Sequence, residues 1–394
     1  MKKIFDKLFI ILGALFILCV LVGVLLKPAV GVSFYENRAL APLPVLNAES
    51  ALDGGFSTDL QAYLTDRAPG RTLAIKAGTF FKLNVLRRPV VNGVAVTDDV
   101  LLQYNPYTTF GTDYIADAAA EVGGDLADLR DFIEELGGSF YYLGVPEQYS
   151  YFSARYPYYL DNRAWCLDII HRDFSAALAK NDIEFIDMAE EYEKLGNPAD
   201  FYFASDHHYN FPGAFAAYTA LIERINSDRA LPLPLLGEDD LSLTALPNPF
   251  LGSRNRELYG LRPMGDSLII AEPKAALPFS RWDNGVSSEP RTNHVPYWSG
   301  DAVSYSVYMG GDFGETVIKT ERPELPRALI FGDSFTNAIE TLLYASFDET
   351  RSLDLRYYDA MTLREYLLDY RPDVVICVRD DTVYLYKTGN GNIA

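Results

Sequence analysis

Apolar and polar residues alternate along the chain in a pattern typical of an α/β protein. Residues 115–136, 161–180 and 211–225 carry apolar side chains at spacings of three and four, which predicts amphipathic helices. SFYYLGV (139–145) and IEFIDM (183–188) are short and mainly apolar, which predicts buried strands. Because strands and helices alternate, we expect a mainly parallel sheet with helices on its faces.

The C-terminal region carries the clearest pattern. Three apolar segments predict strands: RALIFGDSF (327–335), LDLRYYD (353–359) and PDVVICV (372–378). Residues 335–347 and 361–370 separate these segments and predict helices. This order indicates parallel strands, because parallel neighbours need a crossover connection.

The N-terminus carries a segment long enough to cross a membrane. Lysines precede an apolar run over residues 8–26, which as a helix spans about 28 Å, close to the thickness of the hydrocarbon core. Basic residues before the run favour a cytoplasmic N-terminus and an extracytoplasmic bulk. The alternative is a cleaved signal peptide with Ala29-Val30-Gly31 as the cleavage site, but the length of the run favours an uncleaved anchor.

Three parts follow from these patterns. We expect residues 1–27 to be a cytoplasmic stub and transmembrane anchor, and residues 28–55, rich in proline and without a regular period, to be an extended tether. Residues 56–394 form the catalytic domain, beginning with two short helices broken at residues 68–70. From about 230 to 325 the chain is rich in Pro, Gly and Asn, which predicts a loop- and β-rich insertion.

Charge and cysteine content exclude several classes of protein. The net charge is −20, and residues 1–27 carry four lysines and one aspartate, which leaves −23 on residues 28–394. Such acidity argues against binding to nucleic acid or anionic lipid. The three cysteines are Cys19, Cys166 and Cys377, too few for a disulfide scaffold. Buried structural thiols are favoured over a catalytic Cys–His pair.

A serine follows one of the predicted strands. In Gly332-Asp333-Ser334-Phe335 the serine stands between a strand and a helix, where open α/β sheets bind their ligands. A backbone N–H at a helix start is free and favours an anion, so Ser334 can attack a carbonyl group and also help bind the resulting oxyanion. The alternative is an ordinary helix cap.

A second segment supplies a base and a carboxylate. Ser205-Asp206-His207-His208-Tyr209 contains two of the four histidines of the chain. An imidazole is the usual base for a serine, and a carboxylate fixes its tautomer. In an extended segment Asp206 and His208 face one side and His207 the other, which favours an Asp–His pair.

Two other uses of this segment stay open. Its polar residues suit the cap of a helix beginning near Asn210. The segment also suits a metal site, which needs a further ligand such as His171 or His294. We nevertheless expect no metal and no cofactor.

Tyrosine is abundant, with 27 residues. Aromatic faces stack on sugar rings, and Tyr149, Tyr151 and Tyr158, which follow the strand at 139–145, are candidate substrate contacts. The alternative is that each tyrosine simply replaces phenylalanine in a half-buried position.

Five segments carry a recognisable set of residues, in this order: Glu36-Asn37-Arg38 with Leu40 and Pro42-Leu43-Pro44, Asp66-Arg67-Ala68-Pro69-Gly70-Arg71, Tyr202 to Tyr209 with Gly213-Ala214, Gly310-Gly311-Asp312, and Gly332-Asp333-Ser334-Phe335. Together they resemble the DHHW family of exported bacterial proteins. That family is similar to the alginate O-acetyltransferases, which have SGNH-hydrolase-like domains.

The resemblance implies an SGNH-like three-layer α/β fold in which the Asp-His pair precedes the serine. It implies Ser334 as nucleophile and Asp206 with His208 as the catalytic pair. His207, Asp333 and Tyr209 are then expected to lie next to the catalytic groups and hold them in place.

This chain departs from the family pattern in several places. Tyr209 stands where the family has Trp, and Asn210 where Thr often follows. The G-x-N-D block that supplies an oxyanion donor in many SGNH hydrolases is missing. The second donor is therefore to be sought among Asn337, Arg379 and the backbone near Gly144.

The expected reaction is two-step acyl transfer through acyl-Ser334. The resemblance and the anchor favour O-acetylation of a cell-surface or secreted polysaccharide, with an integral membrane partner that delivers the acyl group. One alternative is a carbohydrate esterase of the same mechanism, and another is an inactive polysaccharide-binding or assembly protein.

Overall fold

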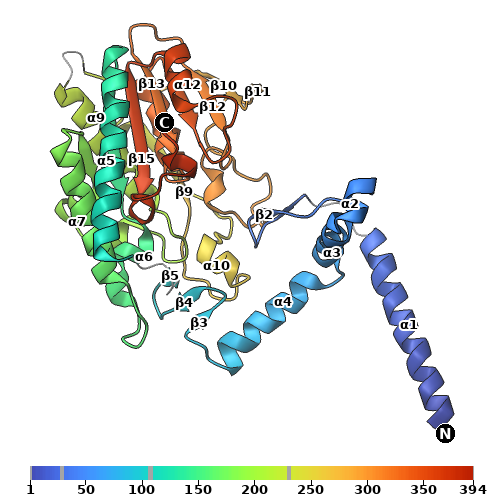
Figure 1. Ribbon diagram of the computed structural model, residues 1–394. Helices are drawn as coiled ribbons and strands as arrows, with labels where there is room; N and C mark the ends of the chain where they lie inside the picture. The colour runs from blue at the N-terminus through green and yellow to red at the C-terminus, as the bar shows by residue number, and fades with distance from the viewer. Residues whose placement is uncertain (1, 27–30, 105–109, 229–231, 394) are drawn as a thin grey trace. The chain divides into compact units, whose positions relative to one another are not determined.

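The computed structural model describes these parts of the chain: residues 2–26, 31–104, 110–228 and 232–393 (Figure 1). Ala29 and Val30 of the possible cleavage site therefore lie outside the described residues. The chain forms two compact units: Met1–Asn92 with Arg256–Arg262, and Gly93–Asn255 with Pro263–Ala394. Residues 56–92 thus belong to the N-terminal unit, whereas the sequence pattern assigned them to the catalytic domain.

The first helix of the N-terminal unit is α1 (Lys2–Leu26). Its segment Ile4–Val24 is apolar and long enough to cross a membrane, and no other described helix meets these two criteria. Length and composition are the basis of this assignment, so α1 is the candidate membrane anchor.

The tether predicted at 28–55 contains regular structure. A short hairpin joins β1 (Val32–Ser33) and β2 (Arg38–Ala39), and α2 (Ala48–Leu52) follows. The two predicted helices are confirmed as α3 (Gly55–Arg67) and α4 (Arg71–Phe80). A π-helical turn and a short strand complete this part of the unit: Phe81–Val85 and β3 (Val90–Val91).

Ion pairs between two of the sequence motifs explain why the tether is ordered. Arg38 donates to both carboxylate oxygens of Asp66, at 2.8 and 2.5 Å, and Arg71 donates to both oxygens of Glu36, at 2.9 and 2.8 Å. Asp66 is buried and also accepts from the Ala41 N–H at 3.0 Å. The bonded guanidinium of Arg38 holds the pKa of Asp66 well below its usual range.

The second unit is built on an eight-stranded sheet with the order β11-β10-β12-β14-β13-β15-β6-β7 among the described residues. Five neighbouring strands are parallel, which confirms the predicted sheet: β14 (Glu349–Leu353), β13 (Arg327–Gly332), β15 (Val374–Asp380), β6 (Ser139–Val145) and β7 (Phe185–Asp187). Three strands extend it in antiparallel order: β12 (Glu315–Lys319), β10 (Ser280–Asp283) and β11 (Val286–Ser288).

These antiparallel strands come from the predicted insertion. Part of residues 230–325 therefore continues the main sheet and is not a separate addition to it. The same region contributes a two-stranded sheet of β8 (Leu241–Ala245) and β9 (Ile269–Pro273). Shorter elements of this unit and of the junction are β4 (Val94–Val96), β5 (Leu101–Gln103), α6 (Gln148–Tyr151) and α10 (Ser253–Glu257).

Helices cover both faces of the sheet and give three layers (Figure 1). One face carries α5 (Thr112–Glu135), α7 (Ala164–Lys180) and α12 (Leu363–Tyr370), and the other carries α8 (Met188–Leu195), α9 (Phe211–Asp228) and α11 (Thr336–Leu343). Alternate residues of the central strands enter the two cores: on β15, Ile376 faces one core and Cys377 the other.

One predicted strand is displaced. LDLRYYD was expected at 353–359, but β14 ends at Leu353. The backbone carbonyl of Asp354 accepts from the N–H groups of Tyr357 and Tyr358, both at 2.9 Å, and its carboxylate accepts from the Arg356 N–H at 3.0 Å. These local bonds form a turn in place of the ladder.

The ion-pair cluster of the N-terminal unit leads to a first prediction. Asp66→Ala leaves the guanidinium of Arg38 and the Ala41 N–H without this acceptor, so the free energy of unfolding should fall by about 1–3 kcal/mol. Urea denaturation of the detergent-solubilised chain measures it. The exposed Asp59→Ala on α3 is the matched control and should change by less than about 0.5 kcal/mol; an equal loss in both variants contradicts the prediction.

Candidate active site

Ser334 lies at the carboxyl end of β13, where the strand turns into α11. Gly332 is required at this turn, because a Cβ there would lie 2.2 Å from the backbone oxygen of Val378 on β15. The carboxylate of Asp333 accepts from the Phe335 N–H at 2.9 Å. Asp333 therefore caps the turn, and Ser334 is left to face the neighbouring segment.

A hydrogen-bonded series links this serine to the Asp206–His208 pair. His208 Nε2 lies 2.7 Å from Ser334 Oγ, and His208 Nδ1 lies 2.6 Å from Asp206 Oδ1. Asp206 is 0% exposed and His208 4%. Serine, imidazole and carboxylate are thus arranged as in a Ser-His-Asp triad, with the base oriented by the buried acid.

Two residues of the predicted insertion hold the segment that carries this carboxylate. The Ser253 N–H donates to Asp206 Oδ2 at 2.6 Å. Asp266 accepts from the N–H and the hydroxyl of Ser205, at 2.8 and 2.5 Å. Sequence reasoning missed Ser253 and Asp266, because they lie about 50 residues or more beyond the motif and carry no pattern of their own.

Aromatic rings enclose the imidazole of His208. The Tyr305 ring stacks on it, with centroids 3.8 Å apart and planes 5° apart, and the Phe335 ring lies 4.8 Å away. These rings fix the orientation of the imidazole and exclude water from its face. Tyr305 also comes from the insertion and was not predicted.

The predicted orientation of His207 is wrong. Its ring does not point away from the pair but lies 3.7 Å from the ring of His208. The segment is bent and not extended, and His207 Nδ1 lies 2.7 Å from Ser253 Oγ. His207 therefore lies beside the candidate triad.

The same residues form the group best suited to a metal ion in the described chain. Potential ligand atoms of Asp206, His207 and His208 lie within 4.8 Å of one another. Neither histidine proposed as a further ligand joins them: His171 Nε2 lies 2.7 Å from Asp187, and His294 Nε2 lies 3.1 Å from Arg281. Both ring nitrogens of His208 are engaged, by Asp206 and Ser334.

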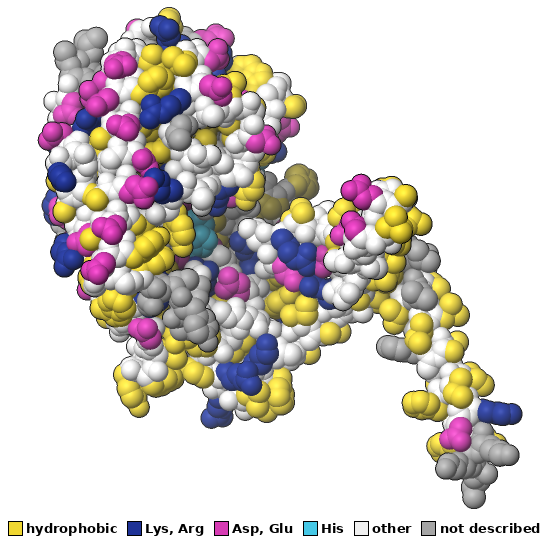
Figure 2. Space-filling model, in the orientation of Figure 1, with side chains coloured by type: hydrophobic (Ala, Val, Ile, Leu, Met, Phe, Trp, Pro, Cys, Tyr) yellow, Lys and Arg dark blue, Asp and Glu magenta, His cyan; other side chains and the backbone are white. Residues whose placement is uncertain are grey.

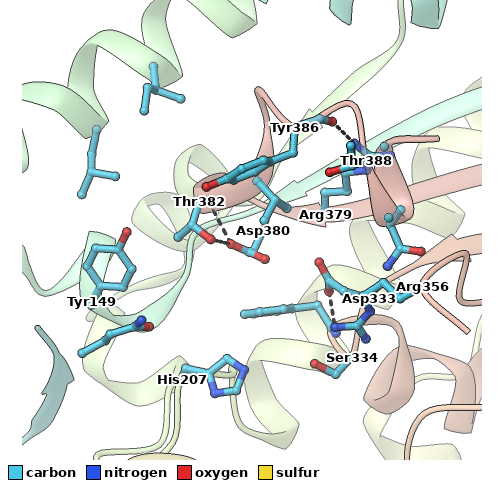
Figure 3. A pocket seen from close by; sticks show the side chains of 18 of the residues that line it. Tyr149, His207, Asp333, Ser334, Arg356, Arg379, Asp380, Thr382, Tyr386 and Thr388 are labelled. Atoms are coloured by element: carbon cyan, nitrogen blue, oxygen red, sulfur yellow. Dashed lines mark hydrogen bonds between the residues drawn. The ribbon is translucent and has the colours of Figure 1, made fainter. Parts of the chain in front are cut away.

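A cavity of about 420 Å³ adjoins Ser334 at the carboxyl ends of the central parallel strands (Figure 3). Figure 2 shows histidine atoms, in cyan, at a hollow on the side of the molecule that faces the viewer. Four more predicted site residues line the cavity: Tyr149, His207, Asp333 and Arg379. The structure therefore brings them to the serine, from separate segments of the chain.

Three other candidates do not line the cavity. The side-chain amide of Asn337 donates to Asp312 at 2.9 Å. Gly144 lies inside β6, where an added Cβ would meet the hydroxyl of Tyr384. Tyr158 is 98% exposed.

Two predicted tyrosines have packing positions. Tyr151 packs among other aromatic rings, including that of Tyr202 at 5.6 Å. Tyr209, at the family's Trp position, is buried and donates its hydroxyl hydrogen to the backbone oxygen of Phe335. It thereby ties the Asp-His segment to the Ser334 turn.

Two carboxyl groups line the cavity together. Asp333 and Asp380 come from the ends of the adjacent strands β13 and β15 (Figure 3). Burial, with the charge of Asp380 second, raises the pKa of Asp333 to about 7, and burial also raises the pKa of Asp380. Near neutral pH this pair therefore retains a proton.

The fold and the site define an SGNH-like α/β architecture, and solved structures share it. Two structures of PatB1 from Bacillus cereus, one with a sulfonyl adduct, match at 25% identity. Their TM-scores are 0.61 and 0.62, over 74% of this chain and 97% and 96% of theirs.

A DHHW family protein from Eubacterium siraeum matches with a TM-score of 0.57 and 20% identity, over 77% of this chain and 95% of that one. The resemblance to the DHHW family is thereby confirmed for the fold. A weaker likeness, with a TM-score of 0.45 and 14% identity, relates 75% of this chain to the O-acetyltransferase domain of Pseudomonas putida AlgJ. No protein-family model and no curated protein matches the sequence.

The close approach at Gly252 leads to a prediction. An added Cβ would lie 2.3 Å from the Ser205 backbone oxygen and 2.8 Å from Asp206 Cβ, so Gly252→Ala must displace the segment that holds the carboxylate. We expect a loss of about 1–3 kcal/mol in stability, measured by thermal unfolding. Gly124→Ala on α5 is the matched control, since nothing lies within 4 Å of its Cβ position. A loss of stability in the control as large as in Gly252→Ala contradicts this account.

The raised pKa of Asp333 predicts a pH dependence. The folded state holds its proton up to about pH 7, whereas an unfolded aspartate loses it near pH 4. This stabilising contribution is full below about pH 4 and is lost as the pH rises to about 7. The melting temperature of the wild type relative to that of Asp333→Asn should therefore fall between pH 4.5 and 7.5, because only the aspartate must lose a proton. A constant difference contradicts the assignment.

Proposed function

We propose that this protein is a serine-dependent acyltransferase that O-acetylates a cell-surface or secreted polysaccharide through an acyl-Ser334 intermediate. The observation that carries the proposal is the series Asp206–His208–Ser334, with distances of 2.6 and 2.7 Å. An imidazole between a buried carboxylate and a hydroxyl at a strand end is suited to activating that hydroxyl.

In the first step His208 Nε2 accepts the proton of Ser334 as Oγ attacks the carbonyl carbon of the acyl donor. The Asp206 carboxylate accepts from Nδ1–H and stabilises the imidazolium that forms. The tetrahedral intermediate then collapses, the leaving group takes the proton from His208, and the acyl group remains on Ser334.

The oxyanion of this intermediate needs donors. The Ser334 N–H, at the start of α11, is the first donor in this proposal. Of the three candidates for the second, Arg379 alone lines the cavity among the described residues.

In the second step His208 takes the proton of an incoming hydroxyl as that oxygen attacks the acyl carbon. The tetrahedral intermediate then collapses, and His208 returns the proton to Ser334 Oγ as the ester bond to the serine breaks. A sugar hydroxyl gives a transferase and water gives an esterase. The cavity of about 420 Å³ has room for a sugar beside the serine, and Tyr149 lines its wall.

Two further observations support this chemistry and its location. PatB1, at 25% identity, carries a sulfonyl adduct in one structure, and sulfonyl reagents modify activated nucleophiles. The apolar helix α1 suits a single-pass anchor, with the catalytic unit on the extracytoplasmic side and a membrane partner that supplies acyl groups.

The serine mechanism predicts a shared loss of activity. With p-nitrophenyl acetate and the detergent-solubilised chain, Ser334→Ala and His208→Ala should each lower kcat by about 10³-fold or more. Intact mass should show an acetyl adduct in the wild type and none in Ser334→Ala. The exposed Ser227→Ala and the half-exposed His171→Ala are matched controls and should retain activity.

Other outcomes distinguish the alternatives. Activity that survives Ser334→Ala, or that disappears with a chelator, favours a metal site at Asp206, His207 and His208. An acetate yield unchanged by added oligosaccharide favours an esterase. Absence of turnover and adduct in every variant favours an inactive polysaccharide-binding protein.

A further inference from the structure

Several hydrogen-bond donors on the wall of the cavity beside Ser334 have no partner. Among the described residues, these buried atoms are Nε and Nη2 of Arg379, Nε of Arg163 and Nδ2 of Asn390, and all three residues line the cavity. A buried donor without an acceptor costs about 1–3 kcal/mol. Such a cluster on the wall of a cavity is suited to an acceptor carried by a bound molecule.

Arg379 offers the donors with the most specific geometry. It is 2% exposed, and its Nη1 donates to the Tyr386 backbone oxygen at 3.4 Å. Nε and Nη2, the unpaired atoms, lie along one edge of the planar guanidinium. Two parallel N–H groups on one edge fit the two oxygens of a carboxylate or phosphate.

The other charged groups that line the cavity are bonded to partners other than the free donors of Arg379. Arg356 is held by Asp354, at 2.6 to 3.1 Å, and by Asp312 at 3.3 Å. The Asp380 carboxylate accepts from the N–H and hydroxyl of Thr382, and Asp333 accepts from the Phe335 N–H. Of the arginines that line the cavity, Arg163 and Arg379 keep unpaired donors.

We propose that this cavity recognises a carboxylate on the substrate, bound by the Nε–Nη2 edge of Arg379 with Asn390 and Arg163 as further donors. The inference rests on the proposed function, since it gives a substrate class to the Ser334 site. The C-terminal segment that includes Tyr386 and Gly391 lines the cavity and lies against Nη1 of Arg379, on the other side of the guanidinium from the proposed binding edge.

Two sources can present such a carboxylate. It can belong to the acyl group, as in a dicarboxylic acyl chain whose far end is charged. It can equally belong to an acidic sugar of the acceptor. The acyl donor and the acceptor sugar would each present the same planar anion to Arg379. The two sources differ only in which of the two substrates carries the carboxylate.

The first test measures binding and is independent of turnover. Thermal unfolding of the detergent-solubilised chain is followed with succinate or D-glucuronate, and with succinamide or D-glucose as neutral counterparts. The anions should raise the melting temperature more than their neutral counterparts. Arg379→Gln should weaken binding of the effective anion about tenfold or more. The exposed Arg172→Gln, whose partner is Asp173, is the matched control.

The second test separates the two sources by kinetics. For the acyl group, mono-p-nitrophenyl succinate is compared with p-nitrophenyl acetate. For the acceptor, a glucuronate-containing oligosaccharide is compared with a glucose oligosaccharide, with p-nitrophenyl acetate as donor. In one of these pairs, Arg379→Gln should lower the ratio of kcat/KM for the charged over the neutral substrate about tenfold. Asn390→Ala should lower the same ratio of kcat/KM while Arg379 stays in place. This second variant keeps the test decisive if Arg379→Gln fails to fold.

Specific results overturn the inference. Equal stabilisation by charged and neutral probes overturns it directly. An equal loss for charged and neutral substrates in Arg379→Gln assigns this arginine to the oxyanion instead. If no variant forms an acetyl adduct or turns over any ester, the acyltransfer proposal fails, whereas the binding measurement still decides the carboxylate site.

Discussion

The rest of the site depends on one buried charge, the carboxylate of Asp206. A fully enclosed carboxylate is costly unless hydrogen bonds replace its lost water. Here the Ser253 N–H binds one oxygen at 2.6 Å, and the other oxygen lies 2.6 Å from His208 Nδ1. The same bonds that keep the charge buried also orient the imidazole towards Ser334. Stability and catalytic geometry therefore depend on the same contacts.

Close approaches of the backbone position these groups. The central parallel strands direct their carboxyl ends to one edge, and Gly332 lets β13 approach the backbone of β15. Gly252 likewise lets its own segment approach the backbone of Ser205 and the Cβ of Asp206 closely. Because residues with side chains do not fit at these points, the triad distances follow from backbone packing rather than from flexible side chains.

The cavity combines groups of opposite character. A shared proton lowers the negative charge of the Asp333–Asp380 pair, while Arg379 keeps one edge of its guanidinium unpaired. A neutral acetyl group presents no carboxylate to such an edge. We infer that the cavity wall adds selection for a charged substrate to the proposed acyl-transfer chemistry.

The order of most helices and strands is predictable from the sequence, because apolar periodicity shows locally which face of an element is buried. Local motifs also single out Ser334, Asp206 and His208 as candidate catalytic residues, since each stands in a short motif beside a predicted element. The contacts of Ser253, Asp266 and Tyr305, the unpaired edge of Arg379 and the position of His207 beside His208 are visible only in the folded chain. The reason is physical: these contacts join segments far apart in the chain, and long-range packing leaves no periodic signal in sequence.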